Sequence, residues 1–107
     1  VSEPTASILL KLKREIESTG ARFSLTVVPS KLRNLNPTEK HDGPEFSDKW
    51  KAWAASQGMD FIDLASAFRE TSSKGELLFF KEDIHFNSAG HQLTSQILAN
   101  ALRPALK

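Results

Sequence analysis

The sequence contains no cysteine, so disulfide bonds, thiolate catalysis and cysteine-based zinc sites are all excluded. No apolar run approaches the roughly eighteen residues that a membrane-spanning helix needs, and we predict no transmembrane segment. Neither sign of charge is in excess, because the formal net charge is only +1. This provides no electrostatic basis for binding nucleic acid or an anionic membrane. An initiator methionine and a signal peptide are also missing, so we expect the sequence to begin inside a longer product.

The composition that remains is typical of one soluble globular domain. The chain has 107 residues, of which 39% are hydrophobic and 25% are charged. No repeat, linker or low-complexity segment divides it, and we predict a single domain over 1–107.

Three segments have the periodicity of amphipathic helices, namely 4–19, 47–57 and 88–102. Ser2, with Pro4 in the first turn, and Ser47 are the expected N-caps of the first two. Gly20 and Gly58 are placed to end the same helices. The side chains expected to face the core are Ile8, Leu9, Leu12 and Ile16 in the first helix, Trp50, Trp53 and Ala54 in the second, and Leu93, Ile97, Leu98, Ala101 and Leu102 in the last.

Two segments between these helices predict strands. Residues 22–28 are β-branched and largely apolar, as in a buried parallel strand, and 59–63 form a second, shorter strand. The order of helices and strands predicts a parallel sheet with helices on its faces. Two strands cannot cover several amphipathic helices, so we interpret the chain as the C-terminal part of a larger α/β fold. The remaining expectations are a long loop over 29–46, a helical turn over 64–68, a turn over 72–75 and an extended segment over 77–80.

The segment 81–91 carries the chemistry, and it reads KEDIHFNSAGH. In an extended segment, residues two apart point the same way, so Asp83 and His85 would share one side and Ile84 would face the core. A carboxylate beside an imidazole holds one tautomer and stabilises the imidazolium formed when the ring accepts a proton. Asn87 is expected to cap the following helix or to brace the loop.

Residues 79–91, followed by an amphipathic helix, resemble the last conserved block of the SGNH (GDSL-type) hydrolases. In that family an acid and a histidine lie in a loop before the final helix. The Asp-x-His spacing of Asp83 and His85 is more similar to the relatives that acetylate polysaccharides than to the plain esterases. Glu82 occupies the position three before His85, where many members have their acid, so it is the alternative to Asp83.

The resemblance implies a three-layer α/β/α, flavodoxin-like fold with a parallel sheet. It implies a serine-dependent ester hydrolase or acetyltransferase acting on a small-molecule or carbohydrate ester, with His85 as base and Asp83 as orienting acid. No metal or organic cofactor is required by such a mechanism. The sequence contains no Gly-Asp-Ser block and no Gly-x-Ser-x-Gly elbow, so we expect the nucleophile upstream of this chain.

Other interpretations of the same residues remain. Asp83, His85 and His91, with His41, have ligand atoms that suit zinc, but their spacing matches no standard metal motif. Ser30 follows a predicted strand but lacks the glycines of a nucleophile elbow. A different class of function is a non-catalytic α/β module that binds a carbohydrate or a protein partner. Residues with weaker claims are Asn34 and Asn36 as oxyanion-hole donors and Trp50 and Trp53 as a sugar-stacking platform.

Overall fold

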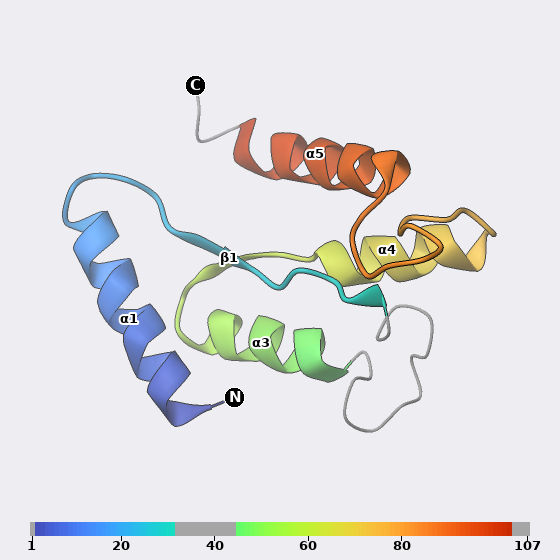
Figure 1. The fold of residues 1–107 in the computed structure, drawn as a ribbon. Coiled ribbons are helices and arrows are strands. Elements are labelled where there is room, and N and C mark those ends of the chain that lie inside the picture. Colours follow the sequence, from blue (N-terminus) through green and yellow to red (C-terminus); the bar gives the residue numbers. More distant parts are fainter. Residues whose placement is uncertain (1, 32–44, 104–107) are drawn as a thin grey trace.

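The computed structural model describes residues 2–31 and 45–103, and it is a mixed α/β structure (Figure 1). The observed order of helix, strand, helix, strand and helices agrees with the order predicted from sequence patterning. The elements are α1 (Glu3–Glu17), β1 (Ser24–Thr26), α3 (Glu45–Ser56), β2 (Asp60–Ile62), α4 (Leu64–Ser73) and α5 (Ser88–Leu102).

The two strands form a small parallel sheet in which Ser24, Leu25 and Thr26 pair with Asp60, Phe61 and Ile62. Both strands have only three residues, so the strand predicted over 22–28 is too long. The β1 residues are half-buried rather than buried, and the Val28 side chain is 66% exposed. The physical reason is the partner strand: among the described residues, β2 pairs with β1 over three residues only, so the rest of 22–28 has no strand beside it.

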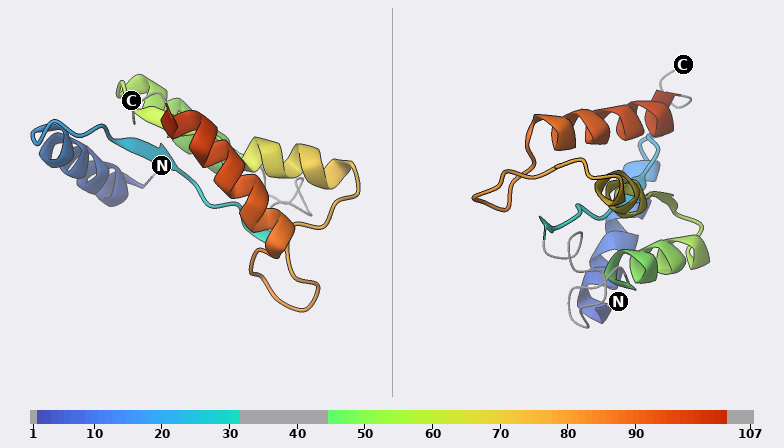
Figure 2. Two further views of the ribbon diagram at one scale, coloured as in Figure 1. Left: turned by 90° about the horizontal axis from the view of Figure 1, so that it is seen from above. Right: turned by 90° about the vertical axis from the view of Figure 1, so that its right-hand side faces the viewer.

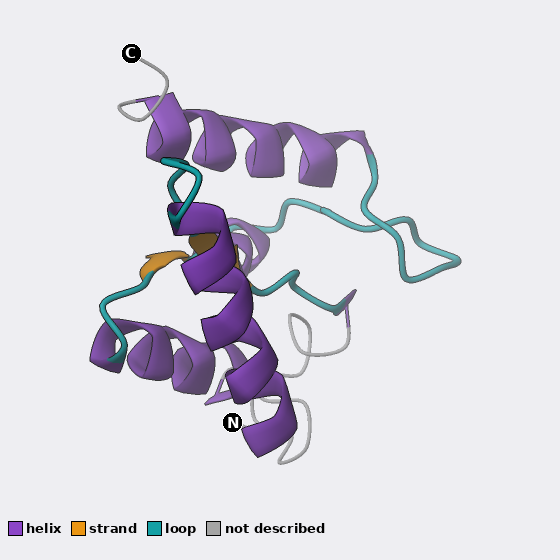
Figure 3. Ribbon diagram, turned by 90° about the vertical axis from the view of Figure 1, so that its left-hand side faces the viewer, coloured by secondary structure: helices purple, strands orange, loops and turns teal. Residues whose placement is uncertain are grey.

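Helices lie on both sides of this sheet. In Figures 1 and 3, α5 runs along one side of the strands, whereas α3 lies on the opposite side. Residues of α3 and of α5 both approach β2. No helix of the described residues is long and apolar enough to cross a membrane.

The interior consists of two apolar clusters. The first contains Phe23, Ala54 and Met59 as its buried members, with side chains of α1 packed against them. The second contains Phe68, Leu78 and Phe79, and the Phe68 ring is fully buried. The second cluster lies between α4, α5 and the loop that connects them, so this loop is anchored by aromatic packing.

The ends of the helices were predicted with uneven success. Gly20 and Gly58 adopt φ values of +89° and +64°, as expected of glycines that end helices. Helix α5 has the predicted bounds, whereas α4 extends the predicted turn over 64–68 to ten residues. Ser47 is wrong as a cap, because α3 begins at Glu45 and places Ser47 inside the helix, where it is 6% exposed.

The predicted buried faces of α1 and α5 also need correction. In α1, Ile8 and Leu12 are 66% and 41% exposed, while the buried position is Ala6. In α5, Leu102 is 36% exposed and Ala101 is exposed as well. Apolar periodicity gives the stripe of a helix, but the small surface available within the described structure covers only part of each stripe. The half-buried apolar residues of these two helices are Leu9, Leu10, Ile16, Ala89, Leu93, Ile97 and Leu98.

Candidate functional site

The segment that carries Asp83 and His85 is a loop closed at its base by backbone pairing. Phe79 and Phe86 form an antiparallel bridge, and the Phe80 amide donates to the His85 carbonyl at 3.0 Å. The Asn87 amide donates to the Leu78 carbonyl at 3.0 Å. The loop therefore turns back on itself before α5 begins, and it projects from the body of the chain in both views of Figure 2.

Within this loop, one carboxylate oxygen contacts both the backbone and the ring of the histidine. Asp83 Oδ1 accepts a hydrogen bond from the His85 amide at 2.8 Å, and it lies 3.4 Å from His85 Nδ1. The predicted proximity is thus observed, but the segment is bent rather than extended. Ile84 is 74% exposed, so the expectation that it faces the core is wrong. An Asp side chain that accepts the amide two residues on forms a local turn, and this turn replaces the predicted alternation.

Both side chains are accessible. The His85 and Asp83 side chains are 77% and 54% exposed, so a reacting group can reach the imidazole from solvent. His85 Nδ1 faces the acid, and the second ring nitrogen, Nε2, lies outside this contact. Glu82, the alternative acid, is also exposed, but the observed contact with the imidazole is made by Asp83.

A lysine from a distant part of the sequence occupies the inner side of the loop. Lys31 Nζ donates to the carbonyl oxygens of Phe80 at 2.7 Å, Lys81 at 3.1 Å and Asp83 at 3.0 Å. Lys31 follows β1 by five positions, so the loop is fastened to the segment that leaves the carboxyl end of that strand. Sequence patterning gave no indication of this role, because the partners are 49 to 52 residues away.

Asn87 fixes the other end of the loop, as predicted for either a cap or a brace. Its Oδ1 accepts from the Gly90 amide at 2.9 Å and so caps α5. Its Nδ2 donates to the carbonyls of Leu77 at 2.8 Å and Phe79 at 3.4 Å. One amide side chain therefore joins the start of α5 to the segment that leads into the loop.

Gly90 allows α5 to approach this segment closely. A Cβ atom at position 90 would lie 2.1 Å from the Leu78 carbonyl oxygen and 3.1 Å from Phe86 Cβ. Only a residue without a side chain fits there without moving the backbone. The Asn-x-x-Gly pattern of residues 87–90 thus has a packing explanation that sequence reasoning missed.

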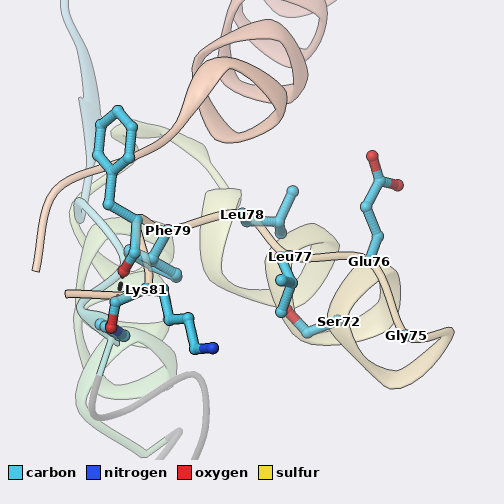
Figure 4. Close-up of a pocket in the computed structure, with 9 residues that line it drawn as sticks. Ser72, Gly75, Glu76, Leu77, Leu78, Phe79 and Lys81 are labelled. Carbon is cyan, nitrogen blue, oxygen red and sulfur yellow. Dashed lines mark hydrogen bonds between the residues drawn. The ribbon is translucent and has the colours of Figure 1, made fainter. Parts of the chain in front are cut away.

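A pocket of about 520 Å³ opens beside the loop (Figure 4). The segment 75–81 lines much of it, together with Ser72 of α4, and Figure 4 shows these residues side by side. Leu77 and Phe80 are 70% and 51% exposed, so apolar surface is available to a ligand or to another part of a protein. Lys31, which holds the loop, is also a lining residue.

Two carboxylates at the sheet, Asp60 and Asp63, have lowered pKa values. Arg22 donates to Asp60 and thereby lowers the pKa of that carboxyl group. Burial alone would raise the pKa of Asp63, but hydrogen bonds from the Ser66 amide and hydroxyl and from Lys51 lower it. Asp63 caps α4 directly after β2, so its charge serves the joint between strand and helix.

The remaining candidates from the sequence are the possible metal ligands, Ser30, the two tryptophans and the two loop asparagines. Among residues 2–31 and 45–103, no three His, Asp or Glu side chains come together as metal ligands. His91 instead packs against the Phe86 ring, with ring centroids 5.5 Å apart. Ser30 is half-buried and immediately precedes Lys31. The Trp50 and Trp53 rings pack edge to face at 5.4 Å, and both are half-buried. His41, Asn34 and Asn36 lie outside the described residues.

Comparison with known families gives one match over nearly the whole chain. Residues 2–107 match the model of a family described as ALGX, the SGNH hydrolase-like domain of the acetyltransferase AlgX. No curated protein and no solved structure matches the sequence.

Proposed function

Because the chain belongs to the family of SGNH hydrolase-like domains of the acetyltransferase AlgX, we propose that it supplies the base and the orienting acid of a serine-dependent acyl transfer. His85 is the base, and Asp83 is the acid. The substrate class is an acetyl ester, with a polysaccharide hydroxyl group as acceptor. The serine is supplied by a part of the domain outside residues 1–107.

The proposed reaction has two half-reactions that use the same imidazole. His85 Nε2 takes the proton of the serine hydroxyl as its oxygen attacks the acetyl carbonyl, and Asp83 stabilises the imidazolium from the Nδ1 side. The tetrahedral intermediate expels the donor alcohol, which receives the proton from His85. The acceptor hydroxyl then gives its proton to His85 as its oxygen attacks the acetyl-serine. The second tetrahedral intermediate expels the serine oxygen, which takes this proton back from His85, and the acceptor is released as the new ester. Water in place of the acceptor would give hydrolysis.

The observation that supports this proposal is the contact between Asp83 and His85 within a closed loop. One carboxylate oxygen contacts the His85 amide and the His85 ring, so the acid and the base share a fixed backbone turn. The lysine that holds this turn comes from the segment after β1. Ligands of open α/β sheets bind beyond the carboxyl ends of the strands, which favours the same edge for the reacting groups.

The complete domain is proposed to be a three-layer α/β/α fold of flavodoxin-like type, with residues 1–107 as its C-terminal portion. The placement of α3 and α5 on opposite sides of a parallel sheet supports this arrangement. A two-stranded parallel sheet is small for a domain of this kind, and further strands would give the exposed apolar faces a partner.

The test is the turnover of three variants of the complete protein at saturating acetyl ester. His85→Ala should lower kcat by on the order of 10³-fold or more, because proton transfer is lost in both half-reactions. Asp83→Asn should cost less, since the imidazole keeps its base function but loses its orienting charge. Glu82→Gln is the matched control and should retain most of the activity.

Two outcomes would contradict the proposal in different ways. If Glu82→Gln lost most of its turnover while Asp83→Asn kept the turnover of the unmodified protein, Glu82 would be the orienting acid. If His85→Ala left turnover unchanged, the hydrolase interpretation would be refuted and the binding module would be favoured. The apolar pocket beside the loop supports that second function. In that case the protein should still bind carbohydrate or a partner, and Phe80→Ala should weaken the binding.

A further inference from the structure

We propose that Lys31 is a positioning residue that holds the Asp83–His85 turn in its reactive geometry. The proposal rests on the proposed function, because a positioning residue requires a reacting pair to position. It names a residue that carries no proton in the reaction and that neither motif nor spacing singled out.

The number of contacts matches the chemistry of the ammonium group. A lysine ammonium has three N–H donors and no acceptor, and Lys31 Nζ has three carbonyl acceptors at 2.7, 3.1 and 3.0 Å. All three acceptors belong to one loop of six residues, between Phe80 and His85. Each bond involves a charged donor, so it is stronger than a hydrogen bond between neutral groups.

The partner matters because three carbonyl groups of the loop converge on Lys31 Nζ, and their residues lie outside the helices and strands of the described structure. The backbone pairs of the loop base involve Phe79, Phe80, Phe86 and their neighbours, and they end before the tip. Carbonyl oxygens that converge on one point repel one another, because each carries a partial negative charge. A cation at that point offsets the repulsion and keeps the tip in a single conformation.

The geometry also connects the tip to the acid. Lys31 binds the backbone carbonyl of Asp83, while the Asp83 side chain binds the amide of His85 and contacts its ring. The ammonium therefore restrains the same residue that restrains the imidazole. Loss of Lys31 should loosen the acid and the base together while leaving both chemical groups intact.

The experiment compares Lys31→Met with Lys11→Met, an exposed lysine of α1 that serves as the matched control. The first readout is hydrogen exchange of the Phe80 and His85 amides in the complete protein. Lys31→Met should increase their exchange about tenfold or more, the factor that the loss of a charge-assisted hydrogen bond provides. Amides in the middle of α5 should be unaffected in both variants, which shows that the fold is retained.

The second readout is turnover by the complete protein. Lys31→Met should lower kcat by about tenfold or more with little change in KM, because the reacting groups are misplaced while substrate contacts remain. Lys31→Arg should recover only part of this loss, since a planar guanidinium cannot direct three N–H groups from one nitrogen. Lys11→Met should behave like the unmodified protein.

The outcomes separate this proposal from the one on which it rests. Suppose that His85→Ala loses turnover but that Lys31→Met leaves the exchange of the Phe80 and His85 amides unchanged. This result would refute the positioning role of Lys31 and leave the proposed function intact. A kcat of Lys31→Met equal to that of Lys11→Met would refute it as well. If His85→Ala left turnover unchanged, the proposed function would be refuted, and the positioning role of Lys31 would be refuted with it.

Discussion

Asp83 and His85 contact each other in a place where the contact contributes little to stability. Their side chains are 54% and 77% exposed, and ion pairs in such surroundings are screened by water. The pair is nevertheless held by a turn, a bridge and a lysine, which supports the proposed role of the two residues in acyl transfer. The residues that stabilise this region are the aromatic rings below the loop and the amide of Asn87.

A single glycine controls how α5 meets the loop. Gly90→Ala should destabilise the chain by about 1–3 kcal/mol, the usual cost of overpacking, because its Cβ would lie 2.1 Å from a backbone oxygen. Urea unfolding measures the change. Asn100→Ala, at an exposed position of the same helix, is the control and should be neutral or slightly stabilising. Equal stability of Gly90→Ala and the unmodified chain would show that the helix shifts freely.

At the scale of elements, capping and charge pairing join the helices to the sheet. Asp63 follows the last residue of β2 and caps α4. Its Oδ2 also accepts a hydrogen bond from Lys51 Nζ of α3 at 3.1 Å. One carboxylate thus connects three elements. Arg22 and Asp60 make a second charged pair at the other end of the paired strands.

These two carboxylates predict how stability depends on pH. The pKa values of Asp60 and Asp63 are lowered in the folded state. Their contribution is therefore fully present above the unfolded pKa, near 3.8, and is lost as the pH falls through the lower folded values. The urea midpoint should be lower at pH 3 than at pH 7, and the difference should shrink in Asp63→Asn.

The control for this experiment is Glu15→Gln, which removes an exposed carboxylate of α1. Its pH dependence should match that of the unmodified chain. A difference between the two pH values that Asp63→Asn leaves undiminished would show that the cap of α4 does not contribute.

At the scale of the whole molecule, the described structure has more apolar surface than its sheet can cover. Ile8, Val28 and Leu77 are each at least 66% exposed; Ile8 lies on α1, and the other two lie in connecting segments. Apolar faces distributed in this way favour association with further structure. The single domain over 1–107 remains a prediction.

The chain by itself should not turn over p-nitrophenyl acetate above background. A base without its nucleophile has no hydroxyl group to activate, so His85 alone cannot support the proposed reaction. Initial rates with the chain, with His85→Ala and without protein should coincide. Turnover that is abolished by Ser30→Ala would contradict this and would identify Ser30 as the nucleophile, beside the lysine that holds the loop.

The sequence by itself determined the features that are encoded within a few residues. Helix α5 begins and ends where its cap and its periodicity predict, and the order of elements gives a parallel sheet. Gly20 and Gly58 lie in the turns that follow α1 and α3, although α1 ends at Glu17, two residues before the predicted end. Periodicity, caps and glycine turns act over one or two helical turns, so a local pattern is sufficient to recognise them. The resemblance of residues 79–91 to the SGNH hydrolases agrees with the family match over 2–107.

Only the tertiary structure decided the features that depend on distant partners. Strand β1 is three residues long because its partner, β2, pairs with it over only three residues. The apolar stripe of α1 is partly exposed because only part of it packs against other elements of the described structure. The bend at Asp83 could not be distinguished from an extended segment by spacing, since both place an acid near His85. Lys31 lies 52 residues from Asp83 in the sequence. The residues around Lys31 contain no pattern that predicts its hydrogen bonds to three carbonyl groups of the loop. That contact exists only once the folded chain has brought the segment after β1 to the loop before α5.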